Sequence, residues 1–140
     1  IGKSEGAQVV IGGEKEQLPG FDGGYYIQPT ILKGENHMRV FQEEIFGPLV
    51  TLQSFQSENE AIQLANETEY GLSATIWTED NEKANRVSVQ IDAGVIWVNC
   101  WLVRDLRTPF GGMKQSGLGR EGGDEALRFF TELKNICNPS

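Results

Sequence analysis

The strongest constraint on the fold is a regular alternation of strand and helix patterns between residues 49 and 99. Short runs rich in apolar and β-branched residues predict strands, and the segments between them carry apolar residues at helical spacing. The expected elements are strands at 49–55, 73–78 and 94–99 and helices at 58–67 and 80–91. This order predicts parallel βαβ units with right-handed crossovers. The near-continuous apolar strands favour burial on both faces.

The segments on either side of this alternation predict less regular structure. A strand is expected at 7–11, an edge or irregular strand at 24–32 because it contains Pro29, and a short helix at 38–43. A long Gly-rich connection at 100–120 precedes a helix at 121–132 and an extended segment, Leu133 to Cys137. Connections of this length inside a compact domain are usually functional.

Composition narrows the class of protein. The 140 residues suit one domain, and 39% hydrophobic residues are enough for a core. A net charge of −8 argues against nucleic acid or an anionic membrane as the main partner. No apolar run approaches the roughly 20 residues that span a bilayer. Two cysteines fit no zinc spacing, so we expect no metal site and a cytoplasmic location. The chain opens without Met, which suggests part of something larger.

Isolated reactive side chains give little evidence for catalysis here. His37 is the one histidine in the sequence and has no Asp, Cys or second His nearby, so a surface position is expected. Cys100 follows a buried-looking strand, and structural burial explains it, and Cys137, better than a nucleophilic role does. The Gly-rich string 110–122 contains G-x-G but no complete phosphate-binding motif. It predicts a backbone path with positive φ rather than a phosphate site.

The segment 42–48 places two carboxylates and an aromatic ring at a forced turn before a strand. A carboxylate held at such a turn can accept two hydrogen bonds from a vicinal diol such as a ribose, and a neighbouring Phe can pack on a flat ring. The alternative is an acidic helix end with a core Phe. Composition alone favours that alternative.

Four motifs occur together in a fixed order. They are E-E-I-F-G-P at 43–48, Y-G-L-S-A at 70–74, G-V-I-W-V-N at 94–99 and P-F-G-G-M-K-x-S-G-x-G-R-E at 109–121. From about Gly6 to Cys137, the chain resembles the C-terminal part of the NAD(P)-dependent aldehyde dehydrogenase superfamily. The resemblance implies an α/β fold in which residues 1–122 are the C-terminal portion of the catalytic domain. It implies that residues 123–140 form a terminal helix and an oligomerisation strand, Leu133 to Cys137, that joins a homodimer or homotetramer.

The resemblance also implies a reaction. In this family a cysteine thiolate attacks the aldehyde, hydride passes to NAD or NADP, and water releases the acid. The family nucleophile lies in an F-x-x-x-G-Q-x-C context, which these residues lack, so the 140 residues alone are expected to be inactive and no catalytic residue is assigned. The resemblance assigns Glu44 to the nicotinamide ribose and Phe46 to the face of the nicotinamide, reversing the preference from composition.

The substrate assignments rest on the loop after residue 99. The resemblance implies that this loop lines the substrate tunnel through Trp101, Arg104, Arg107 and Phe110. Two arginines favour an aldehyde with a distal carboxylate, which a guanidinium binds bidentately. N-C-W-L-V-R-x-L-x-x-P-F-G-G-M-K is also similar to the muconic semialdehyde dehydrogenases, which oxidise 2-amino- or 2-hydroxymuconate 6-semialdehyde. Arg104 is the first candidate for the carboxylate and Arg107 the second. The alternative makes both surface residues around Asp105.

Two other classes of function remain open. The chain could act alone as a non-catalytic assembly or binding module, through the oligomerisation strand. A free nucleotide-binding protein is the weaker alternative, because the phosphate-binding half of the family's enzymes has no counterpart in these residues.

Overall fold

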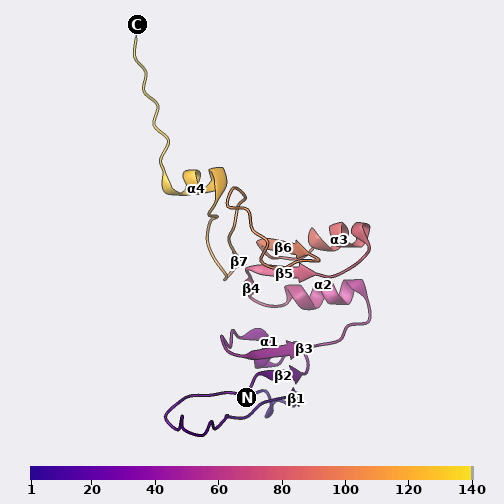
Figure 1. Ribbon diagram of the computed structural model, residues 1–140. Helices are drawn as coiled ribbons and strands as arrows, with labels where there is room; N and C mark the ends of the chain where they lie inside the picture. The colour runs from indigo at the N-terminus through magenta and orange to yellow at the C-terminus, as the bar shows by residue number, and fades with distance from the viewer. Residues whose placement is uncertain (140) are drawn as a thin grey trace. The chain divides into compact units, whose positions relative to one another are not determined.

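The computed structural model describes residues 1–139, which divide into two compact units, Ile1–Leu64 and the chain from Ala65 onward. The elements of the first unit are β1 (Gln8–Ile11), β2 (Thr30–Lys33), α1 (Arg39–Gln42) and β3 (Leu49–Leu52). They form one mixed sheet in the order β1-β2-β3, with β1 antiparallel to β2 and β2 parallel to β3 (Figure 1). The parallel register aligns Thr30 with Leu49, and α1 lies in the connection between these two strands.

The core of the first unit gathers where β2 meets α1. Its buried side chains are Ala7, Leu32, Met38 and Val40. Leu32 alternates with the exposed Lys33 along β2, so one face of the strand carries the apolar packing. Val40 of α1 belongs to this core and Leu49 of β3 packs against it, so the segment between α1 and β3 is held at both ends.

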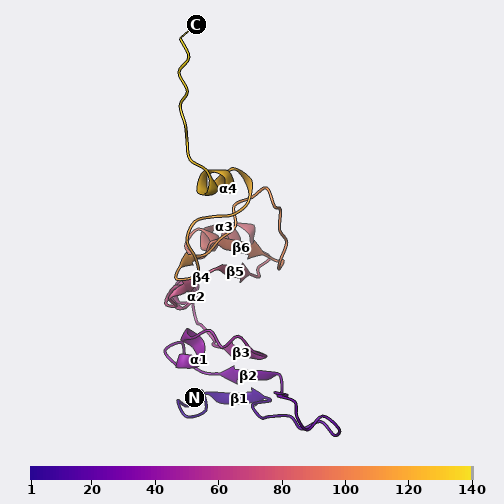
Figure 2. The same cartoon turned by 90° about the vertical axis from the view of Figure 1, so that its left-hand side faces the viewer.

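The remaining elements follow in chain order. They are α2 (Glu58–Asn66), β4 (Tyr70–Gly71), β5 (Ser73–Ile76), α3 (Asn81–Ser88), β6 (Val95–Val98), β7 (Met113–Lys114) and α4 (Gly123–Phe130). β5 and β6 pair in parallel and are joined through α3, which lies beside β6 in both views (Figures 1 and 2). β4 pairs with β7 in antiparallel orientation. Among the described residues, no helix is long and apolar enough to cross a membrane.

Local sequence signals explain two helix starts. The Ser57 hydroxyl accepts the Glu60 amide at 3.2 Å, as a capping box predicts, and the Glu60 carboxylate accepts the Gln56 amide at 2.6 Å. The Asp80 carboxylate accepts the Lys83 amide at 3.0 Å and so caps α3. This hydrogen bond lowers the pKa of Asp80.

Three expectations about the sheets are wrong. β3 and β5 belong to different sheets, so only β5-α3-β6 is a βαβ unit of the expected kind. The β3 strand is not buried on both faces, because Val50 and Leu52 are exposed. The strand expected at 24–32 begins only at Thr30 and is the middle strand of its sheet, with Pro29 just outside it.

The C-terminal segment differs in part from expectation. The helix expected at 121–132 is present as α4, and the described chain from 131 to 139 has neither helix nor strand (Figure 1). Leu133 and Ile136 are exposed there. Pairing of Leu133 to Cys137 with a second chain therefore stays a prediction. Cys137 is exposed, which contradicts the expected burial, and Cys100 is partly buried.

Candidate functional site

The loop between α1 and β3 carries the two residues assigned to a cofactor. Glu43 ends α1 and forms an ion pair with Arg39 at 2.7 Å, which lowers the pKa of the Glu43 carboxyl. The next carboxylate, Glu44, is exposed and makes none of the described hydrogen bonds or ion pairs. The two adjacent acids are therefore distinct: Glu43 stabilises the helix end, and Glu44 remains available to hydroxyl donors.

Phe46 adopts a backbone conformation that a bulky residue rarely takes. Its φ is +50°, in the left-handed region, and its side chain is 93% exposed. This conformation costs an ordinary residue roughly 1–2 kcal/mol. The alternative interpretation of Phe46 as a core residue is wrong, because no burial compensates for the strain. An exposed ring held at a strained turn is typical of a ligand contact.

Arg104, in the loop that follows β6, contacts two other residues through its guanidinium. Its Nη2 donates to Glu121 Oε1 at 2.5 Å, and its guanidinium carbon lies 4.2 Å from the centroid of the Phe110 ring. The structure thus brings two of the predicted substrate residues, Arg104 and Phe110, into direct contact. Glu121 completes the group, although no role was predicted for it.

Arg107 is a surface residue paired with Asp105, which is the alternative to a role in substrate binding. Its guanidinium binds both carboxylate oxygens of Asp105, with Nη2 2.5 Å from Oδ2, and its side chain is 89% exposed. This pairing raises the pKa of Arg107 and lowers that of Asp105. The guanidinium N–H donors of Arg107 are therefore already engaged by Asp105, two residues away.

The backbone of this loop is tied to β6. The indole nitrogen of the buried Trp97 donates to the Val103 carbonyl at 2.8 Å, immediately before Arg104. Leu102 adopts φ +57°, and Trp101 is exposed and makes none of the described polar contacts. Trp101 therefore lies on the same loop as Arg104, but the structure does not show it contacting the other candidates.

The Gly-rich string forms one wall of a hollow of about 350 Å³. Phe110, Arg120 and Glu121 line it together with Phe129 and Phe130 of α4. Gly119 and Gly122 have φ of +70° and +87°, which confirms the expected positive-φ path. A Cβ at Gly122 would lie 2.4 Å from the Thr108 carbonyl oxygen, so only glycine permits this close approach.

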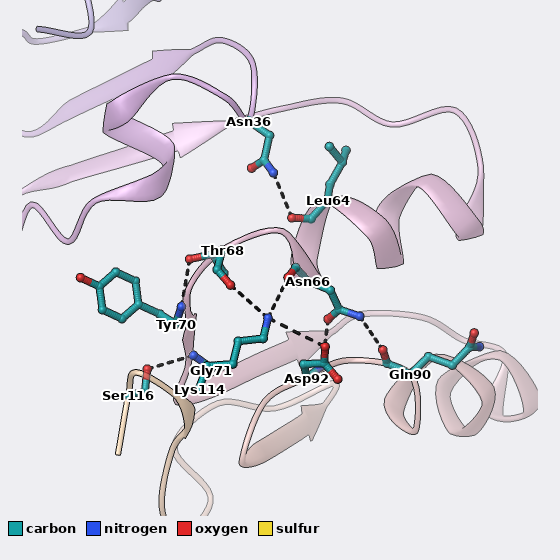
Figure 3. A network of polar contacts seen from close by, with 10 residues as sticks. All are labelled: Asn36, Leu64, Asn66, Thr68, Tyr70, Gly71, Gln90, Asp92, Lys114 and Ser116. Carbon is teal, nitrogen blue, oxygen red and sulfur yellow. Dashed lines mark hydrogen bonds and ion pairs between the residues drawn. The ribbon is translucent and has the colours of Figure 1, made fainter. Parts of the chain in front are cut away.

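Lys114 anchors the string to the rest of its unit, a role that sequence reasoning missed. Its ammonium donates to the carbonyl oxygens of Asn66 at 2.7 Å and Thr68 at 3.0 Å, and it lies 3.9 Å from Asp92 (Figure 3). The Asn66 side chain in turn accepts the Asp92 amide and donates to the Gln90 carbonyl. Lys114 and Glu121 both lie in the 109–121 motif, but the motif does not indicate which residues they contact.

The candidate residues fall into two groups. Glu44 and Phe46 belong to the unit that ends at Leu64, and the loop residues from Trp101 to Phe110 belong to the unit that begins at Ala65. His37 is exposed, with Nδ1 3.4 Å from a Glu35 oxygen. Over residues 1–139, no cluster of three metal-ligating side chains is present.

The comparisons with known proteins identify the family. The aldehyde dehydrogenase family model matches residues 1–136, so the chain belongs to the aldehyde dehydrogenase family. It is 55% identical over 135 residues to 2-hydroxymuconic semialdehyde dehydrogenase of Pseudomonas sp. (strain CF600), covering 95% of this chain and 28% of that protein. It is 50% identical over 137 residues to 2-aminomuconic semialdehyde dehydrogenase of Danio rerio, covering 95% of this chain and 28% of that protein. The chain thus spans little more than a quarter of the length of these relatives.

Solved structures agree with this assignment. HpcC from Thermus thermophilus superposes with a TM-score of 0.89 at 47% identity, covering 96% of this chain and 27% of that one. The Mycobacterium tuberculosis aldehyde dehydrogenase complexed with NAD⁺ superposes with a TM-score of 0.88 at 42% identity, covering 99% of this chain and 28% of that one. The expected family and its α/β fold are therefore confirmed.

Proposed function

We propose that this chain is part of an NAD(P)-dependent aldehyde dehydrogenase that oxidises an aldehyde with a distal carboxylate to the acid. In this proposal residues 1–122 contribute cofactor and substrate contacts to the catalytic domain, and residues 123–140 form the terminal helix and the strand for oligomerisation. The 140 residues alone are inactive, because the nucleophilic cysteine belongs to a segment they do not include. A cytoplasmic homodimer or homotetramer is the expected form.

The observation that carries the proposal is the exposed ring of Phe46 on a strained backbone, two residues after Glu44, whose carboxylate has no described partner within residues 1–139. These residues fit a nicotinamide nucleotide. Glu44 can accept hydrogen bonds from two ribose hydroxyls, and the face of Phe46 can pack on the nicotinamide ring and exclude water from it. When bound, the cofactor supplies a hydride acceptor. The chain's own contribution is to fix the orientation of that acceptor.

Arg104 carries the proposed selectivity for a carboxylated substrate. Its guanidinium is stacked on Phe110, so the fork is ordered before a substrate arrives. Glu121 uses one Nη2 contact, which leaves further N–H donors for a second carboxylate. The two relatives named for muconic semialdehydes are 55% and 50% identical to this chain, which supports a substrate of that chemistry.

The cofactor contact is tested in a chimera. The Pseudomonas sp. (strain CF600) relative supplies the sequence that precedes the match, and these 140 residues follow it. Phe46→Ala should raise the KM for NAD⁺ by about tenfold, since a ring contact of about 1.4 kcal/mol corresponds to that factor. Phe55→Ala removes another exposed ring from the same unit and should leave this KM unchanged. Equal effects of the two variants would contradict the assignment of Phe46.

The substrate contact is tested in the same chimera with 6-oxohexanoate and hexanal, which differ in the distal carboxylate. We expect the chimera to prefer 6-oxohexanoate, and Arg104→Ala to raise the KM mainly for that substrate. An equal loss for hexanal would remove Arg104 from carboxylate recognition.

A further inference from the structure

We propose that Glu121 is a positioning residue for substrate recognition, and that it holds the Arg104 guanidinium on the face of Phe110. The inference rests on the proposed function, in which Arg104 binds the distal carboxylate of the aldehyde. It adds that selectivity for carboxylated aldehydes depends on a residue 17 positions away from the arginine that binds them.

The three residues form a closed group in which each contacts the other two. Arg104 Nη2 donates to Glu121 Oε1 at 2.5 Å, and the guanidinium carbon lies 4.2 Å from the Phe110 ring centroid. Phe110 and Glu121 form an isolated antiparallel bridge, with their amides donating to each other's carbonyls at 2.7 and 2.8 Å. The backbone bridge therefore holds Phe110 and Glu121 opposite each other. Both of their side chains contact the guanidinium of Arg104.

Glu121 and Phe110 also line the hollow of about 350 Å³ beside the Gly-rich string. Arg104 therefore contacts two of the residues that line this hollow. The Arg104 side chain is 40% exposed, so its remaining donors are accessible from solvent. Arginine side chains lose rotamer entropy when they are ordered, and the contacts with Glu121 and Phe110 supply that ordering before binding.

The charge of Glu121 and its hydrogen bond to Arg104 have opposite effects on the binding of a substrate carboxylate. The Glu121 carboxylate orients Arg104, yet its negative charge repels an incoming substrate carboxylate. Glutamine keeps an oxygen that accepts from Nη2 and removes the charge, whereas alanine removes both. A positioning role therefore predicts different results for these two substitutions, and a general structural role does not.

The experiment uses the chimera with 6-oxohexanoate and hexanal. Glu121→Ala should raise the KM for 6-oxohexanoate about fivefold, a modest effect because the ion pair is partly exposed. Glu121→Gln should restore that KM to the starting value or below it. Neither variant should change the KM for hexanal. Glu125→Ala removes the partner of Arg128 on α4 and should change neither KM.

Titration of each variant with adipate, the dicarboxylate product of 6-oxohexanoate, provides a readout that needs no turnover. Adipate affinity should fall about fivefold in Glu121→Ala and recover in Glu121→Gln. The inference is overturned if Glu121→Ala binds adipate as the parent does, or if alanine and glutamine lose affinity equally. If the parent chimera shows no preference for 6-oxohexanoate, the proposed substrate is wrong. If Arg104→Ala abolishes the preference and Glu121→Ala preserves it, only the role of Glu121 is wrong.

Discussion

Replacing Lys114 with methionine should destabilise the unit that begins at Ala65 by about 2 kcal/mol. The ammonium contacts three oxygens from segments 22 to 48 residues away, through carbonyl hydrogen bonds at 2.7 and 3.0 Å and an ion pair with Asp92 at 3.9 Å. Its side chain is 24% exposed, so solvent replaces these contacts only in part. Methionine keeps the apolar stem and removes the charge.

The magnitude follows from these contacts. Hydrogen bonds to charged groups contribute about 1.5–3 kcal/mol each, and the lower value applies to a partly exposed pair. Two such bonds give about 3 kcal/mol, and about 1 kcal/mol returns when the long side chain is no longer held. Lys114 also has a φ of +51°. Lysine and methionine share this left-handed conformation, so its strain does not contribute to the difference between the parent and Lys114→Met.

Urea unfolding followed by tryptophan fluorescence measures the effect, because Trp77, Trp97 and Trp101 all lie in the same unit as Lys114. Lys83→Met, on the exposed face of α3, is the matched control and should change the unfolding free energy by less than about 0.5 kcal/mol. A Lys114→Met variant as stable as the control would refute the reasoning.

Two further predictions concern Phe46 and Asp80. Phe46→Gly should stabilise the first unit by about 1 kcal/mol, because glycine adopts φ +50° without strain. Phe46→Ala keeps the strain and should not stabilise the unit. Hydrogen exchange of the β3 amides distinguishes the two variants. The pKa of Asp80 is lowered from 3.8 by the Lys83 amide, so its cap stabilises α3 above that pH and is lost as the pH falls through the lower folded-state pKa. Asp80→Asn should therefore flatten the loss of stability below about pH 4 in acid titrations followed by circular dichroism, and an unchanged acid limb would contradict the cap.

The parts of the fold that the sequence predicts well are those with local causes. The β5-α3-β6 unit is present as expected, because the Asp80 cap and the apolar runs specify each element within a few residues. Strand pairing is a non-local property, and here the expectation was wrong. β3 pairs with β2 rather than joining β5, although the intervening helix is present where it was predicted.

The same contrast between local and non-local causes explains which residues of the candidate site were predicted from the sequence. Residue type and motif indicated Arg104 and Phe110, which the structure brings into contact. Their third partner, Glu121, is 17 residues from Arg104, and the Lys114 contacts span 46 and 48 residues. No periodicity or spacing rule reaches such distances, so these polar contacts emerge only from the folded chain.

The positions with backbone strain divide into those with compensating polar contacts and those without them. Within the part of the chain that the structure describes, the residues other than glycine with positive φ are Phe46, Asn99, Leu102 and Lys114. Asn99 tolerates this region and bonds both the amide and the carbonyl of Thr78, and Lys114 gains its carbonyl contacts, so the fold itself compensates for the strain at these two. Phe46 and Leu102 are 93% and 62% exposed and make no described polar contact. Packing within the chain does not compensate for their strain, and both lie in the loops assigned to cofactor and substrate. Strain persists where a surrounding structure or a function requires it, so the conformations of Phe46 and Leu102 support the proposal that these two loops contact cofactor and substrate.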